Sequence, residues 1–356
     1  MCQRSRFVRI IAYPGQRTLN LNISRLYTSI VAIVGLLPSH AVAAEEGQST
    51  EAVSQQSLDD AWWTGPIIAA GAGTLPQGHA LVEPYIYDVI RYGRYDNDGD
   101  ERSAARTHSY GSLTYILYGV TDRFTAGLIP TFGYNNVSGG RDSSGIQLGD
   151  VSVQGQYRLT QFQQGSPIPT VSLVVQQTLP TGKYDRLGEN VNDGLGAGAN
   201  TTTLALYSQY YVWMPNGRIL RSRFNVSYAL SDDVDIEDVS VYGTNAGFRG
   251  TASPGDVLTI NSAWEYSITR EWVFAIDLIY QHDASTRVDG LQTDPATGNI
   301  QRIDEDFGSA WRFGVAPAIE YNVTSRVGVI AGARWFVAGR NTSATITPVA
   351  AINMVF

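Results

Sequence analysis

The 356-residue sequence predicts an all-β protein, a transmembrane up-and-down antiparallel β-barrel of about 12 strands with short periplasmic turns and long outer loops. Three observations support this fold. Segments of about ten residues alternate between apolar and polar side chains, their apolar faces carry aromatic residues near both ends, and short and long connections alternate along the chain. Charged residues make up only 16% of the sequence, against roughly 25% in soluble domains.

The segment Trp311–Tyr321 shows the alternation clearly, because its odd positions are apolar and its even positions are small or charged. The segment 272–280 has Trp272 at one end and Tyr280 at the other. A large soluble β-sandwich is the alternative. Strands of soluble proteins usually run about five or six residues, and aromatic residues at both ends suit the two interfaces of a membrane. Both features favour the membrane barrel.

Residues 1–43 are predicted to be a secretory signal peptide. Several arginines precede the apolar run Ile30–Leu37, and the small-residue site Ala41–Ala43 follows it. We expect cleavage after Ala43 or Ala44. A signal-anchor helix is the alternative, but the apolar run is too short to span a bilayer. The mature chain is therefore expected to reach the outer membrane of a Gram-negative cell.

The segment 44–78, which contains Trp62–Pro66, has no strand alternation. It fits either a flexible periplasmic tail or a plug that folds into the barrel lumen. We favour the tail, and place the barrel itself at residues 79–356.

The barrel strands follow from the alternating runs in order along the chain. They are 80–92, 105–118, 124–133, 148–159, 169–180, 203–214, 219–229, 257–267, 272–283, 307–321, 327–338 and 344–356. The longer polar stretches between them, which we expect to be outer loops, are 93–102, 134–147, 181–202, 229–255 and 284–306. An even strand count places both termini of the barrel on the periplasmic side.

A Tyr-x-apolar-Thr pattern recurs where one alternating run ends and another soon begins. It occurs at Tyr118–Thr121, Tyr157–Thr160, Tyr266–Thr269 and Tyr321–Thr324. An interfacial tyrosine followed by a polar turn is what a periplasmic hairpin requires. The last run alternates up to Phe356, and this terminal aromatic resembles the signal that outer-membrane proteins present to the assembly machinery.

The charge balance bears on partners and chemistry. From residue 44 onward there are 20 basic and 33 acidic residues, a net charge of −13, which makes nucleic acid an unsuitable partner.

The only cysteine is Cys2, so disulfides, thiolate metal sites and a cysteine nucleophile are excluded from the mature chain. We expect no metal and no cofactor. The expected partners are outer-membrane lipid and lipopolysaccharide, the assembly machinery and a small solute.

Enzymatic activity is not expected. The mature chain keeps only His79, His108 and His282. Neighbours on one strand point to opposite faces, so His108 and Ser109 cannot pair directly, and no nucleophile has a recognisable catalytic setting.

In each strand, the residues that alternate with the apolar ones point to the opposite face, and these are predicted to line the lumen. The charged candidates are Arg158, Arg221, Arg223, Glu265, Asp277, Arg312 and Glu320, with Asn261, Gln154 and Gln156 beside them. Opposed arginine and carboxylate groups would create a transverse field that selects small polar or aromatic solutes. Alternatively, these charges pair and close the interior. Both interpretations remain open at this point.

Three motifs resemble a known family: Leu75–Gly78 leading into Glu83–Tyr85, then Tyr118–Arg123, then Leu179–Tyr184. The family is the outer-membrane group named for the meta-pathway of phenol degradation, whose members are described as transporters. The resemblance implies a β-barrel that passes small hydrophobic or aromatic compounds. We therefore expect a channel for passive uptake of small solutes, and the alternative is a non-conducting structural or adhesive barrel that acts through its outer loops.

Overall fold

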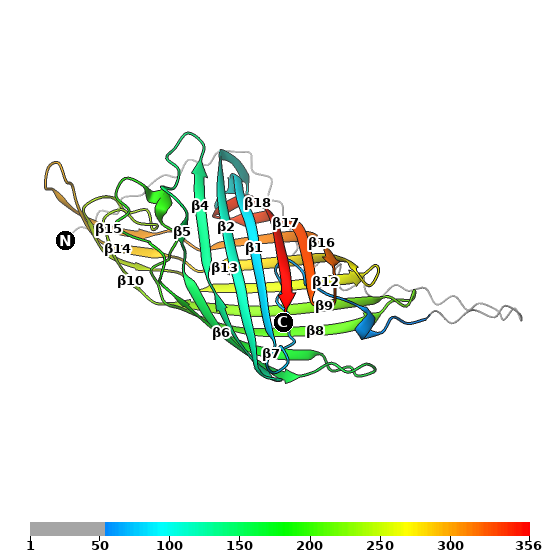
Figure 1. Ribbon diagram of the computed structural model, residues 1–356. Coiled ribbons are helices and arrows are strands. Elements are labelled where there is room, and N and C mark those ends of the chain that lie inside the picture. The colour runs from blue at the N-terminus through cyan, green and yellow to red at the C-terminus, as the bar shows by residue number, and fades with distance from the viewer. Residues whose placement is uncertain (1–53) are drawn as a thin grey trace, which may run out of the picture. The chain divides into compact units, whose positions relative to one another are not determined.

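The computed structural model describes residues 54–356 (Figure 1). The predicted signal peptide, 1–43, lies outside the described residues. Helical structure in the described part consists of two 3-10 turns, η1 (Leu58–Asp60) and η2 (Val191–Asp193). None of the helices between residues 54 and 356 has the length and apolar character needed to span a bilayer.

A closed antiparallel barrel of 12 strands forms the body of the protein. The wall elements are β1 (Ala80–Tyr95), β2 (Glu101–Thr121), β3 (Phe124–Ile129), β4 (Thr131–Val137), β5 (Gln147–Leu148), β6 (Val151–Thr160), β7 (Thr170–Leu179), β8 (Thr201–Trp213), β9 (Ile219–Ser231), β12 (Val257–Ser267), β13 (Trp272–Asp283), β16 (Ala310–Asn322), β17 (Val327–Arg340) and β18 (Thr342–Val355). Strand β1 pairs with both β18 and β2, which closes the cylinder. The predicted fold class and strand count are confirmed.

Two barrel strands are interrupted. Elements β3 and β4 both pair with β2, and Pro130 separates them because proline has no backbone N–H to donate to the ladder. The Pro130 carbonyl still accepts a hydrogen bond from Thr114 N at 3.2 Å. Elements β5 and β6 are separated by Gly149 and Asp150. Each pair of elements therefore forms one strand of the barrel.

The outer face of the wall is apolar and has aromatic residues at both ends. At one end the rings of Trp272 and Tyr321 lie 4.6 Å apart, and at the other end those of Tyr280 and Trp311 lie 6.3 Å apart. Strands β2, β6, β12 and β16 all end within their Tyr-x-apolar-Thr patterns, next to the short turns that we assign to the periplasm. This face belongs in a lipid bilayer, and the protein is an outer-membrane barrel.

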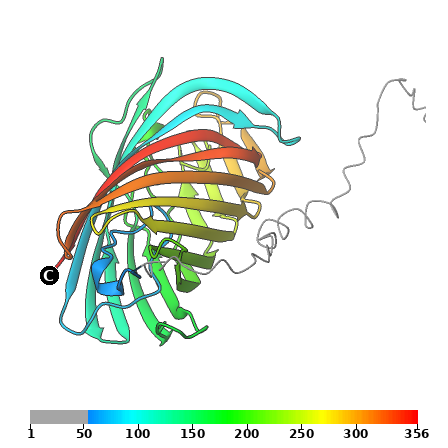
Figure 2. The same cartoon turned by 90° about the vertical axis from the view of Figure 1, so that its right-hand side faces the viewer.

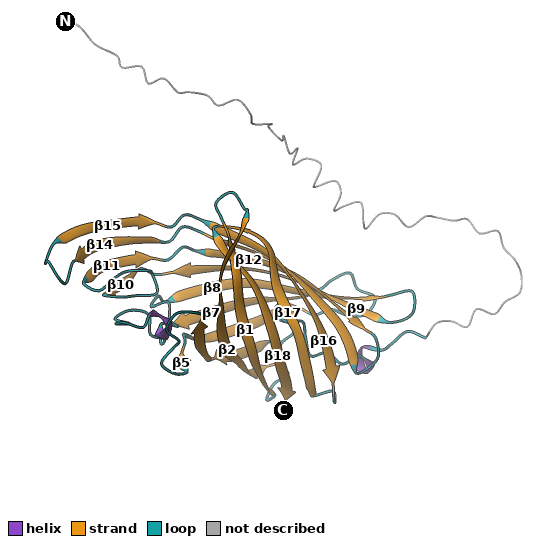
Figure 3. Cartoon of the chain, turned by 90° about the horizontal axis from the view of Figure 1, so that it is seen from above, coloured by secondary structure: helices purple, strands orange, loops and turns teal. Residues whose placement is uncertain are grey.

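The outer connections are more ordered than the sequence predicts. The stretches 229–255 and 284–306 contribute a separate four-stranded sheet of β10 (Val234–Glu237), β11 (Phe248–Ser253), β14 (Arg287–Thr293) and β15 (Ile300–Asp306) (Figure 3). Phe248 and Ile236 are buried in its own small core. The expectation of plain polar loops is wrong here, because short strands with few apolar residues give almost no alternation signal.

Residues 62–75, which we call the strap, run through the inside of the barrel (Figure 2). The favoured expectation of a loose tail is therefore wrong for this part of the 44–78 segment. Alternation of apolar and polar residues reveals only strands. The strap is not a strand, and wall side chains hold it through its backbone groups, so the sequence carries no sign of its position.

Candidate functional site

The strap enters and leaves the lumen at the periplasmic end. Before it, Gln56 N donates to the Gly217 carbonyl at 2.9 Å, and Trp213 Nε1 donates to the Gln56 carbonyl at 2.8 Å, next to the turn between β8 and β9. After Trp62, the chain rises into the barrel and returns to Thr74, whose hydroxyl donates to the Asp122 carbonyl at 2.7 Å. The strap is thus a loop that occupies the periplasmic half of the lumen.

Two wall carboxylates hold the strap by its amides. The Glu320 Oε2 atom accepts hydrogen bonds from Thr64 N at 2.8 Å and Gly65 N at 3.1 Å. The Asp277 carboxylate accepts from Ile68 N at 3.3 Å and Ala69 N at 2.9 Å. Both carboxylates are fully buried. Pairs of successive backbone N–H groups make anion-binding concavities, so each carboxylate is stabilised by the strap.

The strap carbonyls are held by donors on β9, β7 and β6. These contacts are Arg223 Nη1 to Ala69 at 2.6 Å, Asn225 Nδ2 to Ala70 at 2.9 Å, Gln156 Nε2 to Gly71 and Gly73 at 3.1 Å each, and Ser172 Oγ to Ala72 at 2.5 Å. Five successive carbonyls therefore have partners on the wall. The wall side chains recognise backbone groups here.

An ion cluster on β9 and β12 lies beneath the strap. Arg221 and Glu265 are directly opposite each other in the antiparallel register and form a two-point ion pair, and Arg223 Nε lies 2.9 Å from Glu265 Oε2. The Trp63 ring of the strap covers Arg221, with its centroid 4.4 Å from Cζ. Because the cluster is buried, its charges compensate each other instead of facing water.

Small residues on the wall make room for the strap. Ile67 packs against a buried cluster that includes Ala275, Ala318 and Ile330. A Cβ atom at Gly328 would lie 1.9 Å from Thr64 Oγ1, and one at Gly332 would lie 2.6 Å from Ile67 Cδ1. The small residues at these inward positions therefore leave space in the lumen, and the strap occupies that space.

The predicted lumen charges divide into two groups. The structure brings Arg221, Arg223, Glu265, Asp277 and Glu320 together around the strap, and Asn261 and Gln156 join them. Arg158 lies apart on β6, opposite Ser172. Arg312 also lies apart, on β16, where its Cζ stacks 4.8 Å from the Phe336 ring centroid.

A cavity of about 220 Å³ remains between the strap and the wall. Its lining includes Gln154 and Gln156 together with Glu83, Tyr115 and Tyr207. The last three were missed by the sequence analysis. In the run that contains Glu83, odd and even positions both carry apolar residues, so the sequence does not show which side chains of that strand point inward.

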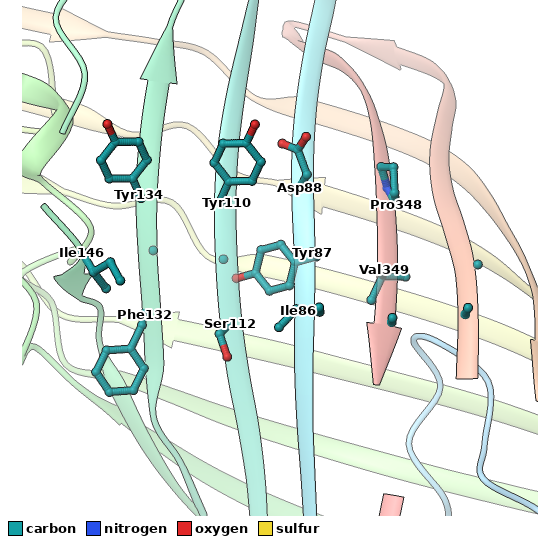
Figure 4. Close-up of a pocket in the computed structure, with 15 residues that line it drawn as sticks. Ile86, Tyr87, Asp88, Tyr110, Ser112, Phe132, Tyr134, Ile146, Pro348 and Val349 are labelled. Carbon is teal, nitrogen blue, oxygen red and sulfur yellow. The ribbon is translucent and has the colours of Figure 1, made fainter. Parts of the chain in front are cut away.

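A larger groove lies elsewhere, on the outer face of β1, β2, β4 and β18 (Figure 4). Its side chains include Ile86, Tyr110 and Phe132, which are exposed on the apolar surface. His108 Nδ1 lies 2.7 Å from Asp88 Oδ2 near this groove, and the His108 and Tyr110 rings stack. Because the groove lies on the apolar face that we place in the bilayer, the lumen is the better candidate for function.

Comparison with known proteins agrees with this architecture. Residues 85–347 match the model of the family described as "Putative MetA-pathway of phenol degradation". The chain belongs to this family. An outer membrane channel from Pseudomonas putida F1 shares the fold with 16% sequence identity and a TM-score of 0.62, covering 82% of this chain and 100% of the other. The Pseudomonas putida toluene transporter TodX matches with 12% identity and a TM-score of 0.38, covering 79% and 90%. No curated protein sequence matches the chain.

Proposed function

We propose that the protein is an outer-membrane channel for the passive uptake of small solutes, including aromatic compounds, and that the strap closes its lumen. One observation supports a channel most directly. Four inward positions of β13, β16 and β17 carry only alanine or glycine (Ala275, Ala318, Gly328 and Gly332), and residues 62–75 occupy the space in front of them. Barrels of about eight strands fill their interior with their own wall side chains, whereas this wider barrel leaves space that a separate segment occupies.

The strap is suited to reversible binding. It is held mainly by hydrogen bonds between wall side chains and its backbone, which contribute about 0.5–3 kcal/mol each according to the charge of the wall group, and water or a polar solute can replace such bonds. Its larger apolar contacts with the wall come from two side chains, Ile67 on the buried alanine cluster and Trp63 over Arg221. Displacement of the strap would therefore open the periplasmic half of the lumen while the barrel stays intact.

The cavity beside the strap gives the proposed solute class. Tyr85, Tyr115 and Tyr207 line it together with glutamine side chains, so it combines aromatic surface with hydrogen-bonding groups. A volume of about 220 Å³ admits a small aromatic molecule and excludes a large one. This chemistry agrees with the family description, which supports phenolic compounds as the first solutes to test.

A structural or adhesive barrel is the second candidate. The observation that favours it is the outer sheet β10, β11, β14 and β15, which has a core of its own around Phe248. This candidate predicts that removal of the 284–306 hairpin abolishes function, whereas a channel would keep its conductance without it.

Planar-bilayer recording of the refolded mature chain distinguishes the two candidates. We expect discrete conductance steps of low open probability, with a phenolic solute reducing the ionic current when it enters the lumen. Steps that are indifferent to the phenolic solute would reduce the proposal to a general small porin. A complete lack of steps from protein shown to be folded would contradict the channel.

A further inference from the structure

The outer half of the lumen, beyond the strap, contains an unusual stack of inward side chains. The Arg312 and Arg334 Cζ atoms lie 4.8 Å and 5.1 Å from the centroid of the same Phe336 ring. Phe336 is fully buried, and both arginines remain partly accessible. A Cβ atom at Gly314 would lie 2.9 Å from the Phe336 ring, so the glycine allows the ring to lie close to β16.

The two guanidinium groups have unmet hydrogen-bonding capacity. Within residues 54–356, neither is in an ion pair with a carboxylate. The buried Nε atoms of Arg312 and Arg334 have no hydrogen-bond partner in the described part of the chain, and neither has the buried hydroxyl of Thr347. Thr347 is directly opposite Arg334 in the register of β17 and β18. Three unsatisfied polar groups are therefore gathered in one place.

The neighbouring polar groups do not neutralise this site. Gln281 lies opposite Arg312 in the register of β13 and β16, and its Nε2 donates to Asp283 at 2.7 Å. The Asp283 carboxylate thus accepts a hydrogen bond from Gln281 and makes no ion pair with Arg312 among the described residues. Two positive charges face one carboxylate, so the site keeps a net positive charge.

We propose that Arg312 and Arg334 form a binding site for the carboxylate of a small organic solute, with Thr347 as an additional hydroxyl partner. Planar guanidinium groups match a carboxylate in geometry and give charge-assisted hydrogen bonds, and stacking on Phe336 fixes their planes. This inference rests on the proposed function only in that the solute reaches the site through the outer mouth of the barrel. The site would concentrate anionic solutes in front of the strap.

Equilibrium binding to the folded mature chain in detergent tests the site without any need for conduction. We expect benzoate to bind, and the neutral benzamide to bind at least about tenfold more weakly, because one charge-assisted hydrogen bond corresponds to roughly that factor. Arg312→Gln/Arg334→Gln should reduce benzoate affinity at least about tenfold. Arg312→Lys/Arg334→Lys should give an intermediate affinity, because lysine keeps the charge and loses the planar fork.

Arg340→Gln is the matched control, since Arg340 is an exposed arginine on the same strand that donates to Ser309 Oγ. It should bind benzoate as the wild type does, and all variants should keep the gel mobility of folded barrels. Unchanged benzoate affinity in the glutamine pair, equal binding of benzamide, or tighter binding of inorganic phosphate than of benzoate would overturn the inference. A chain that binds benzoate without conducting would contradict only the proposed channel.

Discussion

The two halves of the lumen differ in the partners of their buried charged side chains. In the periplasmic half, Glu320 and Asp277 accept strap amides, and Glu265 is paired with two arginines. In the outer half, Arg312 and Arg334 stack on Phe336 and keep unsatisfied Nε atoms. Unsatisfied buried atoms occur in both halves, Glu320 Oε1 among them, so the difference lies in the charges. The charges of the first half are paired or hydrogen-bonded within the chain, whereas those of the second half have no carboxylate partner in residues 54–356, as the proposed binding of a solute carboxylate requires.

The largest expected effect concerns the ion cluster under the strap. Glu265→Gln removes the carboxylate that forms ion pairs with both Arg221 and Arg223, and removing one partner of a buried pair costs about 3–5 kcal/mol. We therefore expect the free energy of unfolding, measured by urea titration in lipid vesicles, to fall by an amount of that order. Glu189→Gln is the control, because its pair with Arg141 is exposed and contributes less than about 1 kcal/mol. Equal losses in the two variants would show that the cluster is not a buried pair in the membrane.

The next effect concerns the hydrogen bonds by which wall carboxyl groups bind the strap. Asp277→Asn/Glu320→Gln keeps the shapes of both side chains and replaces the carboxyl groups that accept four amide hydrogen bonds with amides, which also donate. A hydrogen bond contributes about 0.5–1.5 kcal/mol, or about 1.5–3 kcal/mol where the acceptor is charged, so the closed state should weaken by a few kcal/mol. We expect the open probability in planar bilayers to rise at least about tenfold.

Glu305→Gln on the outer sheet is the control for that experiment, because Glu305 is exposed and distant in sequence from the strap contacts. An open probability unchanged in the double variant would mean that the strap does not limit conduction.

A smaller effect is expected from steric displacement. Gly328→Ala places a methyl group where it would lie 1.9 Å from Thr64 Oγ1 and 2.8 Å from Asn322 Oδ1, so the start of the strap must shift. A cysteine introduced at Ala70 should react several-fold faster with a water-soluble thiol reagent in this background. Gly145→Ala, where an added Cβ meets nothing within 4 Å, should leave the reaction rate unchanged.

The smallest effect concerns the periplasmic anchor of the strap. The Arg270 guanidinium beside Asp60 holds the pKa of that carboxyl below its usual range. A depressed carboxyl pKa gives stability that is present above the unfolded pKa and is lost as pH falls through the folded value. This anchor should therefore stay intact from neutral pH down to about pH 4 and release only in stronger acid. Asp60→Asn should remove the part of acid-dependent strap release that comes from protonation of Asp60, which thiol reactivity at Ala70→Cys would report, while the part that comes from Asp277 and Glu320 remains.

The barrel could be predicted from sequence because lipid and lumen impose opposite demands on alternate residues. In Trp311–Tyr321 the alternation is clean, and the strand pairs as expected. The same parity brought Arg221, Arg223, Glu265, Asp277 and Glu320 to the inner face. The strand β17 gave a weaker signal, because Ile330 and Phe336 share the inward parity of Arg334. The Arg334 partner of Arg312 was missed for this reason.

The strap could not be predicted by the same reasoning. Its contacts use backbone N–H and carbonyl groups, which every sequence supplies, and its own side chains are small. The available signal lay in the wall, where Ala275, Ala318, Gly328 and Gly332 leave inward space that no wall side chain fills. Small inward residues on neighbouring strands indicate that another segment occupies the lumen.

A reducible disulfide between the strap and the wall most directly tests the claim that the strap closes the channel. Thr64 Oγ1 and Asn322 Oδ1 are in hydrogen-bond contact at 3.0 Å, and the sequence has no cysteine after Cys2, so Thr64→Cys/Asn322→Cys offers a single disulfide between strap and wall. Single-channel recording of the oxidised protein should show almost no openings, and addition of a reductant should restore them, while each single-cysteine variant should not respond. Equal conductance in the oxidised and reduced states, with the disulfide verified, would contradict a channel closed by its own strap.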